Sequence, residues 1–203
     1  MPEASSPPGR PRDTTIDAAI LDAAARHLAA NGYEAMSVVA IAEDAGTTRQ
    51  ALYRRWPSKA DLATATIAHI ARGVQRPDSD DPFADLVAEL AAFHEGIGRP
   101  NGMSMVGSML QQATDSDLAS LYRSRVVAPR RRRLRHILQR GIDAGLLDPA
   151  ADLESATAAC TGIHYALALA GARIPKAWPE RTARFVWAAC GGAEPSSDAG
   201  RRG

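Results

Sequence analysis

The sequence has few aromatic residues, few cysteines and little net charge, and each shortage excludes a class of protein. Aromatic residues make up 5% of the 203 residues, whereas hydrophobic residues make up 45%. Because aromatic and β-branched residues favour strands and the abundant alanine favours helices, this composition predicts an all-α fold. The formal net charge of +1 argues against a surface that binds nucleic acid everywhere, so any DNA contact must come from a local basic face.

The cysteines and the hydrophobic runs also limit the possibilities. Cys160 and Cys190 are far apart and match no metal or redox spacing. We expect two small core residues in a reducing compartment, with a disulfide or a thiol sensor as the alternative. No apolar run reaches the roughly 18 residues that a membrane span needs, and residues 1–15 lack the apolar region of a signal peptide. These absences predict a cytoplasmic protein with no membrane partner.

Catalytic motifs are missing as well. The sequence contains no glycine-rich phosphate loop, no serine in a nucleophile elbow and no metal-spaced set of histidine, cysteine and aspartate. The histidines are scattered along the chain. We therefore predict no catalytic residue, no metal site and no cofactor, and we expect that the protein is not an enzyme.

Polar segments rich in proline, serine or glycine divide the chain. We predict a disordered arm over residues 1–14, a DNA-binding domain with a connecting helix over 15–75, a ligand-binding and dimerisation domain over 76–193, and a disordered tail over 194–203. Within the arm, Gly9 to Arg12 resembles an AT-hook, an extended segment whose arginines enter the narrow minor groove. A plain solvated tail is the alternative.

Helical periodicity and capping residues predict four helices in the first domain. The first helix is expected from about Thr15 to Ala30, and Ser37 is expected to cap a second helix over Val38–Asp44. Thr47 or Thr48 caps a third helix that ends at Trp56-Pro57, and Ser58 caps a fourth that continues to about Gln75, with Asp61 completing a capping box.

Similar patterns predict helices through the second domain, with breaks rich in glycine and proline between them. The expected segments are Phe83–Ile97, Met103–Ala113, Asp115–Ala144, Ala151–Ala172 and Pro179–Cys190. Pro129 lies inside the longest pattern and should kink that helix or divide it in two.

A helix-turn-helix motif is predicted by the second and third helices, which a tight turn at Gly46 joins. Between Ala45 and Ala60 the chain has four basic residues and no acidic one. The inward positions of the motif are Ile41, Ala42, Ala45, Leu52 and Trp56. The opposite face is the local basic face that the low net charge requires. A small helical bundle with a solvated basic face is the alternative.

The residues on this face suit duplex recognition. Arg49 and Gln50, with Arg54, can bind purine edges in the major groove. Tyr53 and the hydroxyls of Thr47 and Thr48 suit phosphate oxygens. Lys59 and Ser37 stand where helices begin, and the free N–H groups of a helix N-terminus favour an anion.

These residues closely resemble the DNA-binding region of the TetR/AcrR family over roughly residues 15–65. The matching positions are Ile20, Leu21, Asp22, Ala23, Ala24, Asn31, Gly32, Tyr33, Ser37, Ile41, Ala42, Ala45, Gly46, Leu52, Tyr53, Trp56, Ser58, Lys59 and Leu62. By position, Tyr53 and Lys59 match the family's phosphate contacts. Arg55 stands where histidine is common, and it adds charge near the DNA backbone.

The resemblance implies a homodimer with an all-α fold of about nine helices. An N-terminal three-helix helix-turn-helix domain is followed by a larger helical domain that binds a ligand and dimerises. The family resemblance further implies a repressor that binds a palindromic double-stranded DNA operator and leaves it when a small apolar or amphipathic ligand binds. An activator, or a regulator that responds to a protein partner and has no functional ligand pocket, is the alternative.

The second domain offers candidate ligand residues. Adaptable methionines and aromatic side chains on adjacent helices suggest a pocket, formed by Phe93, His94, Met105, Met109, Tyr122, His164, Tyr165 and Trp178. Ordinary core packing is the alternative for each of them.

Two further patterns lie in this domain. The run Arg130–Arg133 with Arg135 points around a whole helix, so we interpret it as a solvated surface with ion pairs; contact with DNA or an acidic ligand is the alternative. A stripe of small residues fits the family's four-helix dimer interface, with the monomer's own core as the alternative. The stripe consists of Ala156, Ala159, Cys160, Ile163, Leu167 and Ala170.

Overall fold

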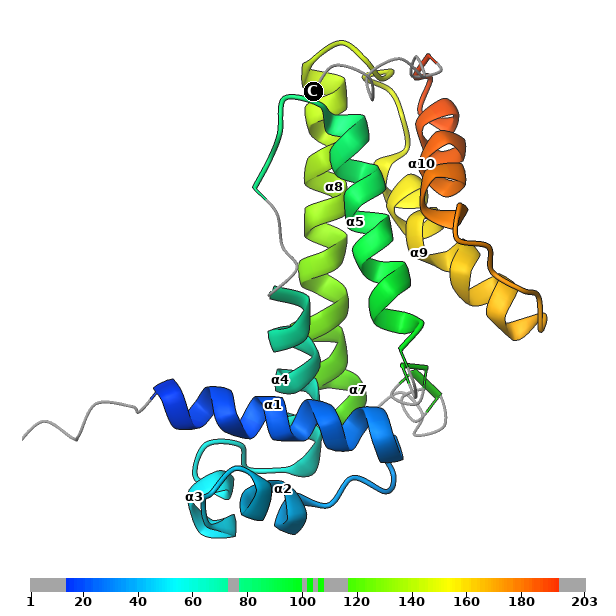
Figure 1. Cartoon of the computed structure of the whole chain (residues 1–203). Coiled ribbons are helices and arrows are strands. Elements are labelled where there is room, and N and C mark those ends of the chain that lie inside the picture. Colours follow the sequence, from blue (N-terminus) through cyan, green and yellow to red (C-terminus); the bar gives the residue numbers. More distant parts are fainter. Residues whose placement is uncertain (1–13, 73–76, 100–101, 104–105, 108–116, 194–203) are drawn as a thin grey trace, which may run out of the picture.

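The computed structural model of the chain describes residues 14–72, 77–99, 102–103, 106–107 and 117–193, and every regular element in these ranges is helical (Figure 1). The predicted all-α fold is therefore confirmed. None of the described helices is long and apolar enough to cross a membrane. The predicted arm with Gly9 to Arg12, the tail, most of the expected helix Met103–Ala113 and the domain boundary at residue 76 lie outside the described ranges.

The first four helices form an N-terminal unit at one end of the molecule (Figure 1). Their bounds are α1 Thr14–Asn31, α2 Val38–Asp44, α3 Arg49–Tyr53 and α4 Lys59–Arg72. Helix α1 runs across this end, and α2 and α3 lie beyond it. Their buried side chains, among them Ile20, Ile41, Leu52 and Leu62, pack into one hydrophobic cluster. Burying a large apolar side chain stabilises the folded state by about 1.5–3 kcal/mol, so this cluster holds the short helices in place.

Local capping sets where these helices begin, as predicted. The Ser37 hydroxyl accepts a hydrogen bond from the backbone N–H of Ala40 at 3.3 Å. Thr48, one of the two predicted candidates, caps α3 by accepting from the N–H of Ala51 at 3.1 Å. The Ser58 hydroxyl accepts from the N–H of Asp61 at 3.0 Å. Each cap satisfies a helix N–H that has no partner within its own helix.

Helix α3 is shorter than predicted. It ends at Tyr53, whereas the sequence pattern placed its end at Trp56-Pro57. The carbonyl oxygen of Leu52 accepts from the N–H groups of both Arg55 and Trp56, each at 2.9 Å. Proline disfavours a helical conformation in the residue before it, and the chain turns away here before α4 begins.

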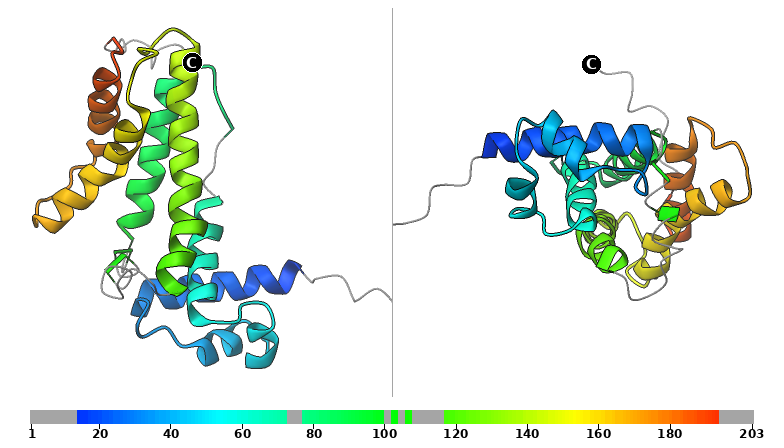
Figure 2. Two further views of the ribbon diagram at one scale, coloured as in Figure 1. Left: turned by 180° about the vertical axis from the view of Figure 1, so that it is seen from behind. Right: turned by 90° about the horizontal axis from the view of Figure 1, so that it is seen from below.

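Four long helices make up most of the remaining described part of the chain (Figure 2). Helices α5 Pro82–Ile97 and α8 Ala128–Asp143 lie side by side, and α9 Leu153–Leu169 and α10 Trp178–Ala189 pack beside them. All four lie within a few residues of their predicted bounds. Their buried residues form a second hydrophobic cluster, which includes Leu90, Ile137 and Val186. Cys160 and Cys190 are buried in this cluster as free thiols, as expected for small core residues.

The long helical pattern around Pro129 is divided, as predicted. Helix α7 Asp117–Tyr122 passes into a π-helical segment, η1 Arg123–Val127, and α8 follows. Pro129 lies in the first turn of α8, where its missing N–H and its ring would disturb the hydrogen bonds of a continuous α-helix. Wider π-helical turns of this kind occur mostly as short bulges inside α-helices.

The connection that leads into α5 is fixed to α8 by two aspartates. Asp85 accepts hydrogen bonds from the Ser79 hydroxyl at 2.7 Å and from Arg140 Nη1 at 2.5 Å. Asp78 accepts from His136 Nε2 at 2.9 Å and pairs with Arg133. These bonds, from His136 foremost and then from Arg133, lower the pKa of Asp78 to about 2.

Candidate functional site

The outer face of α3 gathers most of the residues predicted to read DNA. Arg49, Gln50 and Arg54 are exposed on it, and Thr48 is exposed at its N-terminus. The Arg49 guanidinium lies 5.3 Å from the centre of the half-buried Tyr53 ring. Among the remaining predicted residues, Ser37 is exposed and Thr47 is half-buried. On the inner face Leu52 is buried, so the helix turns its polar side outward.

Gly46 makes the close joint between α2 and α3 possible. Its φ of 63° lies in the left-handed region, which glycine adopts at little cost because it has no side chain. The N–H of Gly46 donates to the carbonyl of Glu43 at 3.0 Å, and that of Thr47 donates to Ala42 at 2.9 Å. The turn therefore fixes the angle at which the exposed face of α3 leaves the N-terminal unit.

Lys59 has partners inside the protein. Its Nζ donates to the carbonyl oxygen of Glu34 at 2.7 Å and lies 4.9 Å from the centre of the Tyr33 ring. Lys59 therefore joins the start of α4 to the turn between α1 and α2. Its predicted contact with a phosphate stays a prediction, and that contact would be made by an ammonium group whose position is already set.

Arg55 has a different role from the expected one. Its Nε pairs with Asp17 at 2.5 Å, its Nη1 donates to the carbonyl of Ala51 at 3.1 Å, and the side chain is 19% exposed. Arg55 therefore ties the end of α3 to α1 instead of adding free charge near the DNA backbone. The sequence around Arg55 gave no sign of this partner, because Asp17 lies 38 positions earlier.

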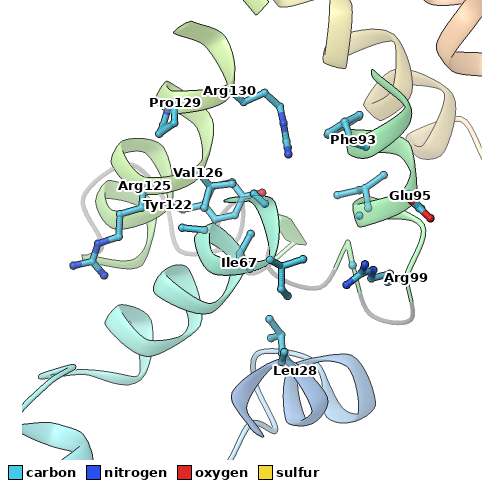
Figure 3. A pocket seen from close by; sticks show the side chains of 18 of the residues that line it. Leu28, Ile67, Phe93, Glu95, Arg99, Tyr122, Arg125, Val126, Pro129 and Arg130 are labelled. Atoms are coloured by element: carbon cyan, nitrogen blue, oxygen red, sulfur yellow. The ribbon is translucent and has the colours of Figure 1, made fainter. Parts of the chain in front are cut away.

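A cavity of about 350 Å³ lies between the N-terminal unit and the long helices (Figure 3). Helices α1 and α4 contribute apolar side chains such as Leu28 and Ile67, and α5 contributes Phe93. Tyr122, Val126, Arg130 and Tyr165 come from α7, η1, α8 and α9. The volume lies within the range of about 300–1,000 Å³ that is typical of ligand pockets.

Three of the predicted ligand residues, Phe93, Tyr122 and Tyr165, line this cavity. Three others, His94, His164 and Trp178, form an adjacent aromatic cluster that contacts Phe93 or its neighbours but is not part of the lining. His94 Nδ1 lies 3.3 Å from His164 Nε2, and the His164 and Trp178 ring centres are 4.9 Å apart. Burial, and then the neighbouring His94, lower the pKa of His164. Met105 and Met109 lie outside the described residues.

Sequence reasoning missed Arg130, which was interpreted as part of a solvated run. Its guanidinium carbon lies 5.0 Å from the centre of the Phe93 ring, and its Nε lies 3.7 Å from Glu89 Oε1. Arg131 pairs with Glu154 and Arg133 with Asp78, as expected of surface ion pairs. A run of four arginines contains no sign of which one turns inward, because the neighbouring helices determine that.

Two tyrosines stand beside Arg130. Tyr122 and Tyr165 both line the cavity, and the Arg130 charge acts on both. Burial raises the pKa of both hydroxyls, against a smaller opposing effect of Arg130. Both tyrosines therefore keep their protons at neutral pH and serve as hydrogen-bonding groups at this end of the cavity.

Arg125 connects the cavity wall to the start of α4. Its Nη2 pairs with Asp61 Oδ1 at 2.7 Å, and its Nη1 donates to the carbonyl of Asp61 and to the Thr64 hydroxyl, each at 3.1 Å. Asp61 belongs to the capping box that begins α4, immediately after the α3 motif. A shift of η1 would therefore act directly on the first turn of α4.

The predicted stripe of small residues on α9 is only partly buried within the chain. Ala156 and Cys160 are buried in the second hydrophobic cluster and Ala159 and Leu167 pack against it, whereas Ile163 is half-buried and Ala170 is exposed. The predicted role of the stripe in a dimer interface stays a prediction. The most exposed large apolar side chains lie elsewhere: Leu169 on α9 is 77% exposed and Phe185 on α10 is 61% exposed.

The described residues contain no group of three or more histidine, cysteine, aspartate and glutamate side chains that could hold a metal ion. Burial raises the pKa of the Cys160 thiol to about 12, with a further contribution from Cys190. A thiol with such a pKa is a poor nucleophile at neutral pH. The chemistry of the molecule therefore concentrates on the outer face of α3 and in the cavity.

Comparisons with known proteins match both parts of the chain. Residues 20–66 match the family model "Bacterial regulatory proteins, tetR family", and residues 76–186 match "Tetracyclin repressor-like, C-terminal domain". The chain is 29% identical to the uncharacterised HTH-type transcriptional regulator YdeS of Bacillus subtilis. The 168 aligned residues cover 82% of this chain and 85% of YdeS.

Solved structures share the fold. The TetR family transcription regulator SCO0332 superposes with a TM-score of 0.71 and 26% identity, over 86% of this chain and 97% of that one. The regulator FadR from Bacillus subtilis, solved in complex with stearoyl-CoA, superposes with a TM-score of 0.61 and 17% identity, over 85% of this chain and 98% of that one.

Proposed function

The chain belongs to the TetR family of bacterial transcription regulators, and from this premise we propose that it is a repressor released from DNA by a small molecule. In this proposal a homodimer binds a palindromic operator through α3. A ligand in the cavity beside α4 then lowers the affinity for DNA. One observation carries the proposal: α4, which directly follows the polar, exposed α3 in the chain, also contributes side chains to the cavity lining.

The arrangement of α3 supports sequence-specific reading. Arg49 and Gln50 stand at its N-terminal end, which is the end of a recognition helix that meets base edges. Arginine can bind guanine through two hydrogen bonds, and glutamine can bind adenine in the same way. Tyr53, Thr48 and Lys59 would contact phosphates and fix the position of the helix on the duplex.

The link between cavity and DNA supports ligand-driven release. Helix α4 contributes Ile67 to the cavity lining, while its first turn carries Lys59 and the capping residue Asp61. A ligand that favours one position of α4 would shift the population of DNA-binding conformers by its difference in affinity for the two states. The structure of FadR, which shares the fold, contains stearoyl-CoA, and this supports the proposal that the present chain also binds a ligand.

The exposed apolar side chains of α9 and α10 support the dimer. Leu169 and Phe185 are the most exposed large apolar side chains among the described residues, and they lie on these last two helices. Proteins of the TetR family act as dimers, and a two-fold dimer matches a palindromic operator. We propose that this face meets its counterpart in a second copy of the chain.

Footprinting of the DNA upstream of the protein's own gene tests the proposal. We expect two protected half-sites related by two-fold symmetry, with centres about 34–36 Å or a multiple of that apart. A compound screen should then find molecules that abolish the footprint, while a protein carrying Arg49→Ala and Gln50→Ala leaves the DNA unprotected. A footprint without symmetry would contradict the proposal, as would a bound state that raises transcription from the adjacent promoter.

A further inference from the structure

The cavity lining is mostly apolar, and charged side chains enter it at a few places. Leu28 and Ile67 lie at the end formed by the N-terminal unit, and Arg130 enters from the opposite side above Tyr122 (Figure 3). The lining between them is mostly aliphatic and aromatic, with Val126 and Phe93 among its members. A ligand that fills this space can place an apolar body against these side chains and an acidic group beside Arg130.

The Arg130 side chain lacks a hydrogen-bond acceptor at one of its donors. It is 23% exposed, and its Nε is buried with no hydrogen-bond partner among the described residues. The Glu89 carboxylate is 3.7 Å away, which is too far for a hydrogen bond. Arg130 lines the cavity, and its guanidinium, whose carboxylate neighbour Glu89 is too distant for a hydrogen bond, can donate to an acidic group of a ligand there.

A second donor lies beside Arg130. Tyr122 and Tyr165 line the cavity together with Arg130, and burial raises the pKa of both hydroxyls, so both keep their protons at neutral pH. A protonated tyrosine hydroxyl can donate a hydrogen bond to an oxygen of a ligand. Arg130 and Tyr165 together form a donor pair that suits the oxygens of an acidic group.

The other arginines of the lining are occupied or lie at its edge. Arg125 binds Asp61 and Thr64 and points away from the cavity (Figure 3), and Arg133 pairs with Asp78. Arg99 is exposed, as is the acidic Glu95. Arg130 is thus the cation whose position and partners fit a ligand inside the cavity.

We propose that the cavity binds an apolar molecule that ends in a carboxylate, with the carboxylate on Arg130 and Tyr165 and the carbon skeleton directed toward Leu28 and Ile67. This inference rests on the proposed function only in taking the cavity as the ligand site. Glu89 holds the Arg130 guanidinium over Phe93 and leaves it able to donate hydrogen bonds to another acceptor. Because Glu89 has the same charge as the incoming group, it also weakens the binding of that group.

Calorimetry on the purified full chain, without DNA, tests the chemistry of the head group. The probes are decanoate, decanol and decylamine, which share one carbon chain and differ in charge. We expect decanoate to bind roughly ten- to a hundredfold more tightly than decanol, as for a hydrogen bond to a charged group, and decylamine to bind most weakly. No binding of decanoate, equal binding of decanoate and decanol, or preference for decylamine would overturn the proposal.

Variants test whether Arg130 causes the preference for decanoate over decanol. Arg130→Met keeps an unbranched side chain over Phe93 and should abolish the advantage of decanoate over decanol, whereas Glu89→Gln should strengthen decanoate binding. The control is Arg135→Met, which removes the same charge from an exposed position on the same helix and should change nothing. If the advantage of decanoate survives Arg130→Met in a protein with an unchanged melting temperature, the assignment is wrong.

The same proteins separate this inference from the proposed function. Decanoate that binds through Arg130 but leaves operator affinity unchanged would contradict ligand-driven release while supporting the head-group assignment. Release of the operator by compounds without an acidic group, together with no binding of decanoate, would contradict the assignment and leave the proposed repressor intact.

Discussion

At the scale of single residues, the exposed face of α3 separates residues that build the motif from residues free to meet DNA. Leu52 is buried, Arg55 is bound to Asp17, and the Thr48 hydroxyl is used as a cap. Arg49 and Gln50 are exposed and project from the first turn of the helix. Base reading should therefore depend on these two side chains more than on any other part of the basic segment.

We predict that Arg49→Ala weakens operator binding by roughly 1–3 kcal/mol and relaxes the preference at one base position. The reason is the loss of a bidentate contact to a purine edge. Titrations against the operator and against a scrambled duplex, monitored by fluorescence anisotropy, measure the effect. Arg135→Ala, on the distant α8, is the charge-matched control. An equal loss on both duplexes would indicate a phosphate contact in place of base reading.

At the scale of elements, ion pairs and hydrogen bonds fix how α4, α5 and α8 meet. Asp78 and Asp85 attach the start of α5 to α8, and Arg125 attaches η1 to α4. The two residues of each pair lie far apart in the sequence. The periodicity of each helix predicts that it forms and roughly where it ends, but the pairing depends on how the helices pack.

The lowered pKa of Asp78 predicts a pH dependence of stability. Its folded-state pKa is about 2, below the usual 3.8, because His136 and Arg133 bind the carboxylate. The group therefore stabilises the fold above about pH 4, and this contribution disappears as the pH falls toward 2. We expect Asp78→Asn to melt at a lower temperature than the wild type at neutral pH. This difference in melting temperature should disappear as the pH falls from about 4 toward 2.

Thermal unfolding followed by circular dichroism between pH 2 and 7 checks this expectation. Asp80→Asn, at an exposed neighbouring position, is the matched control and should melt like the wild type throughout. A difference between Asp78→Asn and wild type that stays constant down to pH 2 would assign the loss to packing and not to the ionised carboxylate.

The bonds of Arg125 predict a variant that separates ligand binding from DNA release. Arg125→Gln removes the ion pair with Asp61 and the bond to Thr64, so η1 no longer acts on the first turn of α4. We expect ligand affinity to change little, while the coupling between ligand and operator loses much of the roughly 1–3 kcal/mol that is typical of allosteric proteins.

Operator release measured at increasing ligand concentration, beside direct ligand binding, checks this prediction. Arg132→Gln, at an exposed site on α8, serves as the control. If Arg125→Gln releases the operator at the same ligand concentration as the wild type, coupling does not pass through this contact.

At the scale of the whole molecule, the fold could be predicted far better than the cavity. Capping residues such as Ser37 and Thr48 act on neighbours three positions away, so their effect is visible in the sequence. The cavity combines side chains from both hydrophobic clusters, including Leu28 and Phe93, with Arg130 beside them. Which side of α8 faces α5, and hence which arginine turns inward, is decided by contacts between helices that no local pattern contains.

The exposed apolar side chains predict how the dimer can be broken. Phe185→Glu should separate the protomers, because two-fold symmetry removes two buried phenyl rings, each contributing about 1.5–3 kcal/mol. Sedimentation velocity should then detect a monomer, and operator binding should weaken strongly. Leu146→Glu, at another exposed apolar position, is the control. A dimer that survives both Phe185→Glu and Leu169→Glu would place the interface on another face.

The π-helical segment η1 has a consequence for insertions and deletions. An α-helix turns by about 100° per residue, and a wider π turn accommodates one residue more. Side chains on the same face of the helix before and after Arg123–Val127 are therefore separated by one residue more than in a regular α-helix. Removing one residue from this segment would leave a regular helix. Because the wider turn spreads one extra residue over nearly the same rotation, Tyr122 would then keep its direction relative to Arg130, whereas a one-residue deletion from a regular part of the helix would rotate the side chains on either side of it by about 100°.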